Sequence, residues 1–377
     1  MKGFSPPPYP YDRLDAFKAL AEAHAGGMVD LSVGTPSDPP PPEVVAALAS
    51  SGAERGYPAS IGSVGLREAA AGWMARRLGV EVPVDAIGAC VGTKEMVAST
   101  AAWLRLRRPD RDTILYPAVS YPTYAMSATL AGCRAVAVPV DDRWRLDLGS
   151  VSAYDAERAL CLWVNSPSNP TGALDDLEAA AGWGRRHGVP VLSDECYVEF
   201  TWKGPPQTIL ASGIEGVLAV HSLSKRSNLA GLRVGFYAGD PELVGYLSEV
   251  RKHAGLMVPG PVQAAAAVAL ADDSHVDAQR ERYARRLAEF SEVLAASFKL
   301  PATPPEGSFY LWVAAPGGDA WGITRRLAEE AGLLVAPGDL YGPAGAGHVR
   351  VAMVAPDDRL ALVAARLAAS GASEGLD

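Results

Sequence analysis

Lys225 lies in a stretch of side chains that could together support covalent carbonyl chemistry. Ser222-Leu223-Ser224-Lys225 is followed closely by Gly231-Leu232-Arg233-Val234-Gly235, so an amine, several hydroxyls and a guanidinium share one short segment. The apolar run Val217–Val220 has strand character, which places Lys225 just beyond the end of a strand. Open α/β sheets bind their ligands at that edge. A lysine among hydroxyls and an arginine suits covalent binding of a phosphorylated carbonyl cofactor.

The same stretch permits three other interpretations. Ser222-x-x-Lys225 matches the serine-nucleophile motif of penicillin-recognising enzymes, but no Lys-Thr-Gly follows it and the strand context differs. A Walker-type phosphate loop would need glycines before the lysine, and the chain has none there. A solvated lysine in a polar turn stays open as long as the tetrapeptide is taken alone. The choice therefore depends on the rest of the chain.

The patterns around this stretch alternate between strand-like and helix-like runs, which predicts an α/β fold with a mostly parallel sheet covered by helices on both faces. The expected strands are Ile87–Val91, Thr113–Tyr116, Ala135–Val138, Ala159–Val164, Pro190–Leu192, Val217–Val220 and Val234–Ala238. The expected helices between them are Glu95–Leu106, Thr123–Ala131, Asp175–His187 and Pro241–His253. After Pro261 the pattern changes to that of a smaller α+β unit. We therefore expect an N-terminal arm and helix over residues 1–30, which pack on the small domain or on a partner subunit, a large domain over 31–260 and a small domain over 261–377.

Three further strands of this predicted sheet end in polar residues. Gly92-Thr93-Lys94-Glu95 follows the first strand and opens a helix, an arrangement whose backbone N–H groups and dipole bind anions. The turn from Asn165 to Gly172 follows another strand, and Asp194 ends a third, where a buried carboxylate is costly unless it is paired. An anion cradle, an amide, an acid and the amine of Lys225 thus meet at one edge. This set fits pyridoxal phosphate, with its phosphate on the cradle, its aldehyde carbon on Lys225 and its ring nitrogen on Asp194.

The composition argues against several classes of protein. The 377 residues are 49% hydrophobic and 20% charged, which is enough for a large core in two domains. The net charge of −9 argues against nucleic acid or an anionic membrane as a partner. No apolar run reaches the ~18 residues that a membrane span needs. The four cysteines are far apart with no Cys-x-x-Cys, which favours reduced thiols and a cytoplasmic location, and the histidines lack the spacing of metal ligands.

Four motifs follow one another along the chain: Asn169-Pro170-Thr171-Gly172, Asp194-x-x-Tyr197, Ser222-x-x-Lys225 and Gly231-Leu232-Arg233-x-Gly235. In this combination the chain resembles the class I and II aminotransferases of fold type I over nearly its whole length. The resemblance implies pyridoxal phosphate as the cofactor and a homodimer as the assembly. It also implies ping-pong transfer of an amino group between glutamate, which becomes 2-oxoglutarate, and a second keto acid.

The resemblance implies a role for each matching residue. Lys225 would hold the cofactor covalently and then move the proton at the substrate Cα, with Asp194 and Tyr197 as the other catalytic residues. The implied cofactor contacts are Asp194 to the pyridine nitrogen, Tyr197 and Asn169 to the ring oxygen, Tyr121 against the ring face, Ser222, Arg233 and the backbone of Thr93 and Lys94 to the phosphate, and Tyr57 to the phosphate of the neighbouring subunit. The implied substrate contacts are Arg350 and Gly34, both to the α-carboxylate, and Asn169.

Within that family the chain is most similar to the bacterial N-succinyldiaminopimelate aminotransferases of lysine and cell-wall biosynthesis. The similarity lies in residues 29–36, 218–225 and 250–263. It implies N-succinyl-2-amino-6-ketopimelate as the amino acceptor, with N-succinyl-LL-2,6-diaminopimelate as the product. Arg251 or Lys252, in the third segment, is a candidate for meeting the distal carboxylates of this substrate by charge pairing.

Other functions stay open at this point. An aminotransferase for aspartate or aromatic amino acids, or a pyridoxal phosphate β-lyase, would share the cofactor residues. A regulator with this fold would need a DNA-binding helical module and a basic face. A dinucleotide-binding dehydrogenase is disfavoured, because Gly345-Ala346-Gly347 precedes a strand and opens no helix.

Overall fold

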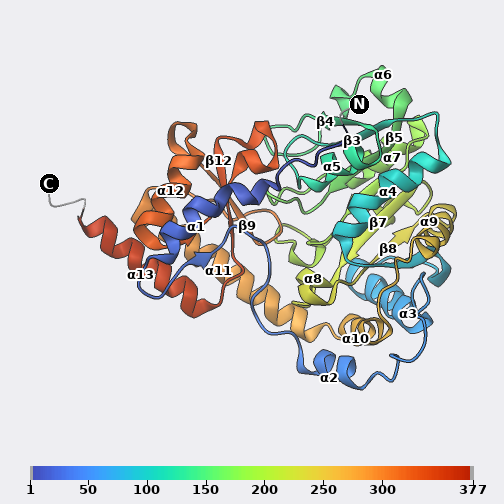
Figure 1. The fold of residues 1–377 in the computed structure, drawn as a ribbon, viewed down its shortest axis with the longest axis horizontal. Coiled ribbons are helices and arrows are strands. Elements are labelled where there is room, and N and C mark those ends of the chain that lie inside the picture. The colour runs from blue at the N-terminus through green and yellow to red at the C-terminus, as the bar shows by residue number, and fades with distance from the viewer. Residues whose placement is uncertain (1–2, 374–377) are drawn as a thin grey trace. The chain divides into compact units, whose positions relative to one another are not determined.

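The computed structural model describes residues 3–373, which divide into two compact units. The larger unit comprises Thr35–Ala284 and Pro305–Phe309, and the smaller unit comprises the chain up to Gly34, Arg285–Pro304 and the chain from Tyr310 onward (Figure 1). The expected boundary after residue 260 therefore differs from the observed division after Ala284. Residues 1–2 and 374–377 of the expected domains lie outside the described residues.

A seven-stranded sheet forms the centre of the larger unit. Its strands lie in the order β2-β8-β7-β6-β5-β3-β4, and β8 alone runs antiparallel to its neighbours. The strands are β2 (Ile87–Cys90), β3 (Thr113–Pro117), β4 (Arg134–Val138), β5 (Ala159–Asn165), β6 (Val191–Asp194), β7 (Val217–Ser222) and β8 (Gly235–Gly239). The predicted α/β class with a mostly parallel sheet is confirmed, and every strand predicted for this sheet is present with small differences at its ends.

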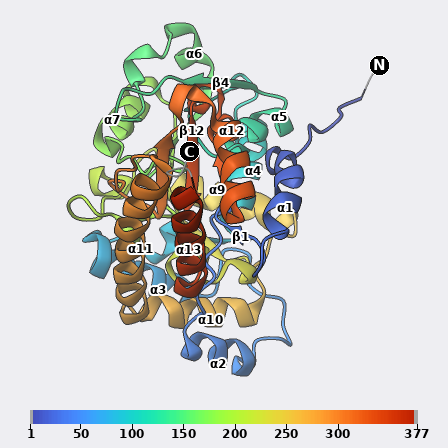
Figure 2. The same ribbon diagram turned by 90° about the vertical axis from the view of Figure 1, so that its left-hand side faces the viewer.

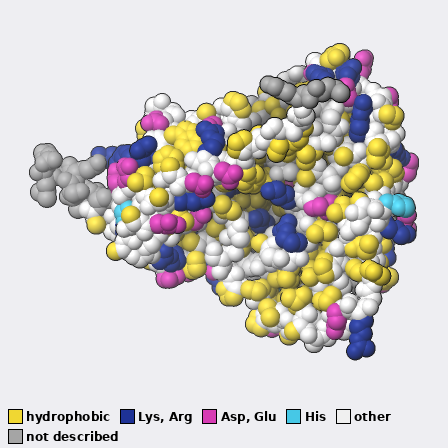
Figure 3. Space-filling view, in the orientation of Figure 1, with side chains coloured by type: hydrophobic (Ala, Val, Ile, Leu, Met, Phe, Trp, Pro, Cys, Tyr) yellow, Lys and Arg dark blue, Asp and Glu magenta, His cyan; other side chains and the backbone are white. Residues whose placement is uncertain are grey.

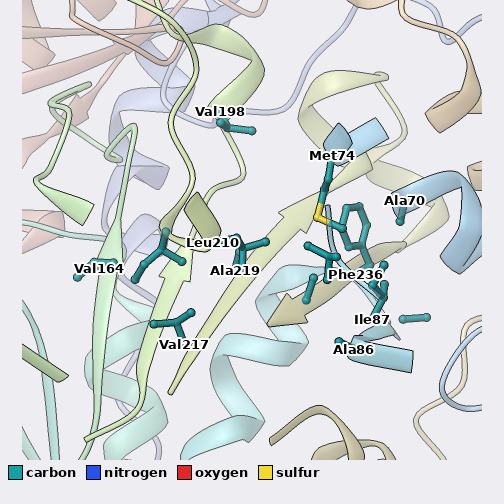
Figure 4. Packing of buried hydrophobic residues seen from close by; sticks show 14 of the residues in the cluster. Ala70, Met74, Ala86, Ile87, Val164, Val198, Leu210, Val217, Ala219 and Phe236 are labelled. Carbon is teal, nitrogen blue, oxygen red and sulfur yellow. The ribbon is translucent and has the colours of Figure 1, made fainter. Parts of the chain in front are cut away.

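Hydrophobic cores lie on both faces of this sheet, because successive side chains of a strand point to opposite faces. Leu162 and Val164 of β5 belong to one core, whereas Cys161 and Trp163 belong to the other. Helices α3, α7 and α10 contribute to the first core, and α4, α5 and α9 contribute to the second. Figure 4 shows part of the first core, where side chains of β5, β7 and β8 are buried. Burial on both faces explains why these strands are almost continuously apolar.

The helices of the larger unit are α2 (Pro42–Ser50), α3 (Val64–Trp73), α4 (Thr93–Arg107), α5 (Thr123–Leu130), α6 (Ala153–Arg158), α7 (Leu177–His187), α8 (Leu223–Arg226), α9 (Pro241–His253) and α10 (Gly260–Ala271). Helix α6 was not predicted, because its 6 residues are too few for an apolar period; Ser152 caps it by accepting a hydrogen bond from the Asp155 N–H. Helix α10 packs against α2 and α3, which keeps it in the larger unit. The division therefore falls within the next helix, α11 (Ser274–Phe298).

The smaller unit contains a three-stranded antiparallel sheet in the order β11-β12-β9 and a parallel pair formed by β1 and β10. These strands are β1 (Val29–Asp30), β9 (Tyr310–Ala314), β10 (Leu333–Leu334), β11 (Ala336–Pro337) and β12 (His348–Ala352). Its helices are α1 (Asp15–Glu22), α12 (Ala320–Ala331), α13 (Asp357–Ser373) and the part of α11 after Ala284. Helix α1 packs on α12, with the ring centroids of Phe17 and Trp321 5.7 Å apart (Figure 2).

Charged side chains of both signs are interspersed on the face of the molecule shown in Figure 3, with apolar side chains between them. This face therefore differs from the continuous basic face that is typical of nucleic-acid-binding proteins. Among residues 3–373, no helix combines the length and the apolar character needed to cross a membrane. The four cysteines, Cys90, Cys133, Cys161 and Cys196, are free thiols.

Asp175, in the loop after β5, makes the stability of the larger unit depend on pH. Its carboxyl group accepts a hydrogen bond from the Leu146 N–H at 2.7 Å, and the residue is only 7% exposed. Burial raises the pKa of Asp175 to about 6. Because this folded-state pKa lies above the unfolded value, the group contributes stability that is fully present below about pH 4 and is lost as the pH rises through 6.

We expect Asp175→Asn to unfold at a higher temperature than the parent at about pH 7.5, because the amide never ionises. The expected gain is about 2 kcal/mol in the free energy of unfolding, and it should shrink toward zero near pH 4. Thermal unfolding of both proteins across this pH range measures the difference. A difference that stays constant with pH would contradict a raised pKa at this position.

Candidate active site

Lys225 lies one turn beyond the end of β7, in the short helix α8. The Ser222 side chain caps this helix by accepting a hydrogen bond from the Ser224 N–H at 3.1 Å. The Lys225 amine lies 6.0 Å from the centroid of the Phe309 ring. The expected position of the lysine, just past a strand end, is confirmed.

Asp194 ends the neighbouring strand β6 and is held by two donors. The Tyr124 hydroxyl donates to Oδ2 at 2.8 Å, and the Cys196 N–H donates to Oδ1 at 3.2 Å. Burial raises the pKa of Asp194, while the hydrogen bonds from Cys196 and Tyr124 and the positive charge of Lys225 oppose that rise. A cationic group bound beside Asp194 would stabilise the carboxylate further, because an opposite charge nearby favours the ionised form.

The N-terminus of α4 forms an anion cradle with Arg233. Gly92 precedes the helix with a φ of +73°, and an added Cβ there would lie 2.2 Å from Arg233 Nη2. Glycine is therefore required both for the backbone conformation and for the close approach of the guanidinium. The N–H groups of Thr93 and Lys94, in the first turn of α4, are two of the four that have no partner within a helix. A helix N-terminus beside an arginine is a ready site for phosphate.

The anion cradle is joined to Asp194 and to Ser222. Cys196 Sγ lies 3.2 Å from Thr93 Oγ1, so the residue that holds Asp194 also contacts the cradle. Ser222 pairs in register with Gly235 of β8, and Gly235 lies against the Thr93 side chain. Thr93 therefore lies close to the last residues of β6 and β7 and to the first residue of β8.

The loop after β5 is tied to the end of β6 through Asn165. Its side-chain amide donates to the Asp194 carbonyl at 2.8 Å and accepts from the Asn169 N–H at 2.7 Å. Asn169 is thereby held beside the end of β6. Tyr197 is also buried there, with its ring centroid 5.3 Å from that of Phe309.

Tyr121 and Tyr57 have different surroundings. The Tyr121 ring packs edge-on against the Tyr124 ring, with 6.2 Å between centroids, and Tyr124 is the residue that binds Asp194. Tyr57 lies in the segment between α2 and α3 and is fully exposed. The larger unit thus gathers the predicted cofactor residues around Asp194 and the cradle, with Tyr57 as the exception.

Arg350 and Gly34 lie together in the smaller unit. Arg350 is 1% exposed, and its guanidinium carbon lies 4.2 Å from the centroid of the Tyr310 ring and 4.8 Å from that of the Tyr341 ring. It also donates to the Ser32 carbonyl. An added Cβ at Gly34 would lie 2.0 Å from the Tyr310 hydroxyl oxygen, so this ring requires glycine at position 34.

We expect Gly34→Ala to destabilise the smaller unit by about 1–3 kcal/mol, because the added Cβ would lie within 2.9 Å of three atoms of the buried Tyr310 side chain, which must then shift. The thermal unfolding midpoint measures this loss. Gly65→Ala in α3 is the matched control, since an added Cβ there meets nothing within 4 Å, and its midpoint should not fall. An unchanged midpoint in Gly34→Ala would contradict the close packing of Tyr310.

The hypothesis that Arg251 meets a distal carboxylate of the substrate is wrong. Its side chain is 0% exposed, and its two Nη atoms donate to the two carboxylate oxygens of Glu95 at 2.6 and 2.8 Å. Arg251 therefore already has a carboxylate partner in the interior. Lys252, the next residue of α9, has a side chain that is 63% exposed, and its Nζ lies 3.7 Å from Glu249 Oε2.

A second buried ion pair anchors the helix that carries Lys225. Arg226 is 4% exposed and donates to Glu199 at 3.3 Å and to the Ala269 carbonyl at 2.7 Å. The Trp73 indole also donates to Glu199, at 2.6 Å. Sequence reasoning missed this pair, together with Asn165, Phe309, Cys196 and Tyr124. The available signal for Tyr124 was its place three residues after Tyr121, in the first turn of α5.

The chain is similar to known proteins over nearly its whole length. The family model described as aminotransferase class I and II matches residues 26–367. The 4-dedimethylamino-4-oxo-anhydrotetracycline transaminase OxyQ of Streptomyces rimosus is 45% identical, over 96% of this chain and 99% of its own. The LL-diaminopimelate aminotransferase of Dehalococcoides mccartyi is 31% identical, over 96% of both chains. Among solved structures, a probable N-succinyldiaminopimelate aminotransferase of Thermus thermophilus superposes with a TM-score of 0.84 and 33% identity, over 95% of this chain and 99% of its own.

Proposed function

We infer that this chain, which belongs to the class I and II aminotransferase family and is a pyridoxal phosphate enzyme, transfers amino groups between glutamate and a second keto acid. When bound, the cofactor supplies an aldehyde that bonds covalently to amines and a ring that withdraws electrons from the substrate Cα. The observation that carries the proposal is the larger unit's combination of an amine at 225, a buried carboxylate at 194 and an anion cradle at the start of α4.

We propose the following roles for the residues that hold the cofactor. Lys225 would bind its aldehyde carbon and afterwards, as a free amine, would take the proton from the substrate Cα and deliver it to that cofactor carbon. Asp194 keeps a proton on the ring nitrogen, since a buried carboxylate is stabilised by an adjacent cation. The remaining proposed cofactor contacts are Tyr197 and Asn169 to the ring oxygen, Tyr121 to the ring face, and Ser222, Arg233, Thr93 and Lys94 to the phosphate.

We further propose that Arg350 and Gly34 bind the substrate α-carboxylate and that Asn169 also contacts the substrate. A planar guanidinium packed against two aromatic rings presents its N–H groups in a restricted orientation, which suits a planar carboxylate. A homodimer is also proposed, in which the exposed Tyr57 reaches the phosphate of the partner subunit. Light scattering of the pure protein tests the dimer, and a monomer at micromolar concentration would contradict it.

The first test of the proposed function is the visible absorbance of the pure protein. We expect a yellow chromophore that is bleached by glutamate and restored by 2-oxoglutarate, since ping-pong transfer proceeds through two separable halves. A preparation that stays colourless after addition of pyridoxal phosphate would contradict the proposal.

For the amino acceptor we propose N-succinyl-2-amino-6-ketopimelate. The support is the similarity to the Thermus thermophilus structure and to the LL-diaminopimelate aminotransferase, both named for diaminopimelate substrates. A polycyclic ketone is the second candidate, because OxyQ is 45% identical over nearly its full length. The test is to measure steady-state kcat/KM for the succinylated keto acid and for the polycyclic ketone. The same measurement with aspartate-type and aromatic keto acids, and an assay for elimination from cystathionine, covers the other candidate activities. Faster turnover of any other compound than of the succinylated keto acid would contradict the first choice.

We expect Tyr124→Phe to lower kcat/KM by about 10-fold, because Asp194 loses a hydrogen bond to a charged group. The loss of kcat/KM should grow as the pH falls. The pKa of Asp194 rises when this hydrogen bond is lost, so a larger share of the carboxyl group is protonated at low pH. The pH profile of kcat/KM measures both effects. Tyr246→Phe is the matched control, because its hydroxyl donates to the Trp103 carbonyl away from Asp194. Equal profiles for the two variants would contradict the role of Tyr124.

A further inference from the structure

The first turn of α4 carries a carboxylate next to the proposed phosphate cradle. Glu95 is the third residue of this helix, directly after Thr93 and Lys94, whose N–H groups form the cradle. A carboxylate in the first turn stabilises a helix through its dipole. It also repels a phosphate bound at the same N-terminus, because like charges at short range repel. Glu95 thus weakens the site unless a cation offsets its charge.

Arg251 of α9 supplies that cation from the interior. It binds both oxygens of Glu95, at 2.6 and 2.8 Å, and is itself completely buried over the Tyr237 ring. Two further donors complete the arrangement, since Glu95 also accepts from the Val91 N–H at 3.2 Å and from the Ser99 hydroxyl at 2.9 Å. The carboxylate therefore has a fixed orientation and a neutralised charge.

We propose that Arg251 is a positioning residue for the cofactor phosphate and that it acts only through Glu95. By cancelling the Glu95 charge, it lets the N-terminus of α4 and Arg233 attract a phosphate dianion at full strength. By holding Glu95 against the Val91 N–H, it also fixes the turn that leads into Gly92 and Thr93. The inference rests on the proposed function, because it takes the start of α4 as the phosphate site.

A purely structural ion pair makes a different prediction from a pair that tunes the phosphate site. General loss of the folded structure would weaken binding of pyridoxal phosphate and of pyridoxal alike, and a local loss of the turn into Gly92 would not be repaired by removing the Glu95 charge. Loss of charge compensation would weaken only the ligand that carries the phosphate. The ratio of the two affinities is therefore the informative measurement, and it needs no turnover.

We expect Arg251→Met, studied as the cofactor-free protein, to bind pyridoxal phosphate about 10- to 100-fold more weakly than the parent. Pyridoxal should bind to both within about twofold, because it has no phosphate to repel. Titrations followed by absorbance give both dissociation constants. The matched control is Lys252→Met, which removes the same charge from the neighbouring, exposed position of α9 and should leave the ratio unchanged.

The double variant Glu95→Gln/Arg251→Met tests whether Arg251 acts through Glu95. It should bind pyridoxal phosphate within about threefold of the parent, because the uncompensated carboxylate is gone. Glu95→Gln alone should shift the ratio in favour of pyridoxal phosphate, since the Arg251 charge is then unopposed. The affinity ratio should thus change in opposite directions in Glu95→Gln and in Arg251→Met. The proposal can therefore be tested with Glu95→Gln even if Arg251→Met does not fold.

Three results would overturn the proposal: equal weakening of both ligands in Arg251→Met, a full defect in the double variant, or a ratio in Glu95→Gln that moves toward pyridoxal. A parent protein that binds no pyridoxal phosphate would instead overturn the proposed function. The two failures are thus distinguishable in one set of titrations.

Discussion

Replacement of Lys225 by alanine is expected to lower kcat/KM by at least ~1,000-fold. The variant loses both the covalent attachment of the cofactor and the amine that moves the proton at the substrate Cα. General acid–base catalysis alone contributes about 100- to 10,000-fold to the rate, which sets the size of the expected loss. The fold should persist, because the neighbouring Arg226 and the cap at Ser222 anchor α8 independently of Lys225.

Single-turnover absorbance with glutamate measures this loss without steady-state complications. The variant should still bind pyridoxal phosphate through the cradle at α4, but its spectrum should lack the band of the lysine-bound form. Lys203→Ala is the matched control, since Lys203 is an exposed lysine of the same unit paired with Glu306 at 2.6 Å. Activity of Lys225→Ala within tenfold of the parent would refute the assigned role.

The strand ends explain why the sequence predicted much of the site. Lys225, Asp194 and Thr93 each follow a short apolar run, and such runs in a parallel sheet end at one edge. Local pattern alone therefore placed three chemical groups near one another before any contact was known. The order of motifs then indicated the family, and the family model that matches residues 26–367 agrees with it.

The contacts that tune these groups were not predictable in the same way. Arg251 and Glu95 are 156 residues apart in the chain, and Tyr124 and Asp194 are 70 apart. Their pairing depends on how α9, α4 and α5 are rotated against the sheet, which an apolar period does not specify. A charged residue near a helix end is usually exposed to solvent and free to bind a ligand, so sequence reasoning offered Arg251, as an alternative to Lys252, as a candidate for binding the substrate.

The division between the units was misplaced for a related reason. The pattern changes after Pro261, where strands give way to helices, and a change of pattern suggests a new domain. Packing decides otherwise, because α10 buries its apolar residues against α2 and α3. Only after α10 does the chain leave the larger unit, within α11.

Asp194→Asn is expected to lower kcat/KM by about 100- to 1,000-fold, the loss typical of removing one preorganised electrostatic group from an active site. The amide preserves the size of the side chain and, with its one oxygen, still accepts the hydrogen bond from either Tyr124 or Cys196. It carries no charge, however, and cannot hold a proton on the ring nitrogen of the cofactor. The loss should therefore appear in kcat, while pyridoxal phosphate still binds through the untouched cradle of Gly92, Thr93 and Arg233.

Asp175→Asn is the matched control for this variant. Both residues are 7% exposed carboxylates that follow strands of the same sheet, but Asp175 bonds to the Leu146 backbone and to none of the proposed cofactor residues. Parallel measurement of kcat, cofactor content and unfolding midpoint separates chemistry from stability. Asp175→Asn should keep full kcat, whereas Asp194→Asn should lose it with its cofactor still bound. Similar kcat values in the two variants would mean that the charge at position 194 has no part in catalysis, and the assignment of the ring nitrogen to Asp194 would fall.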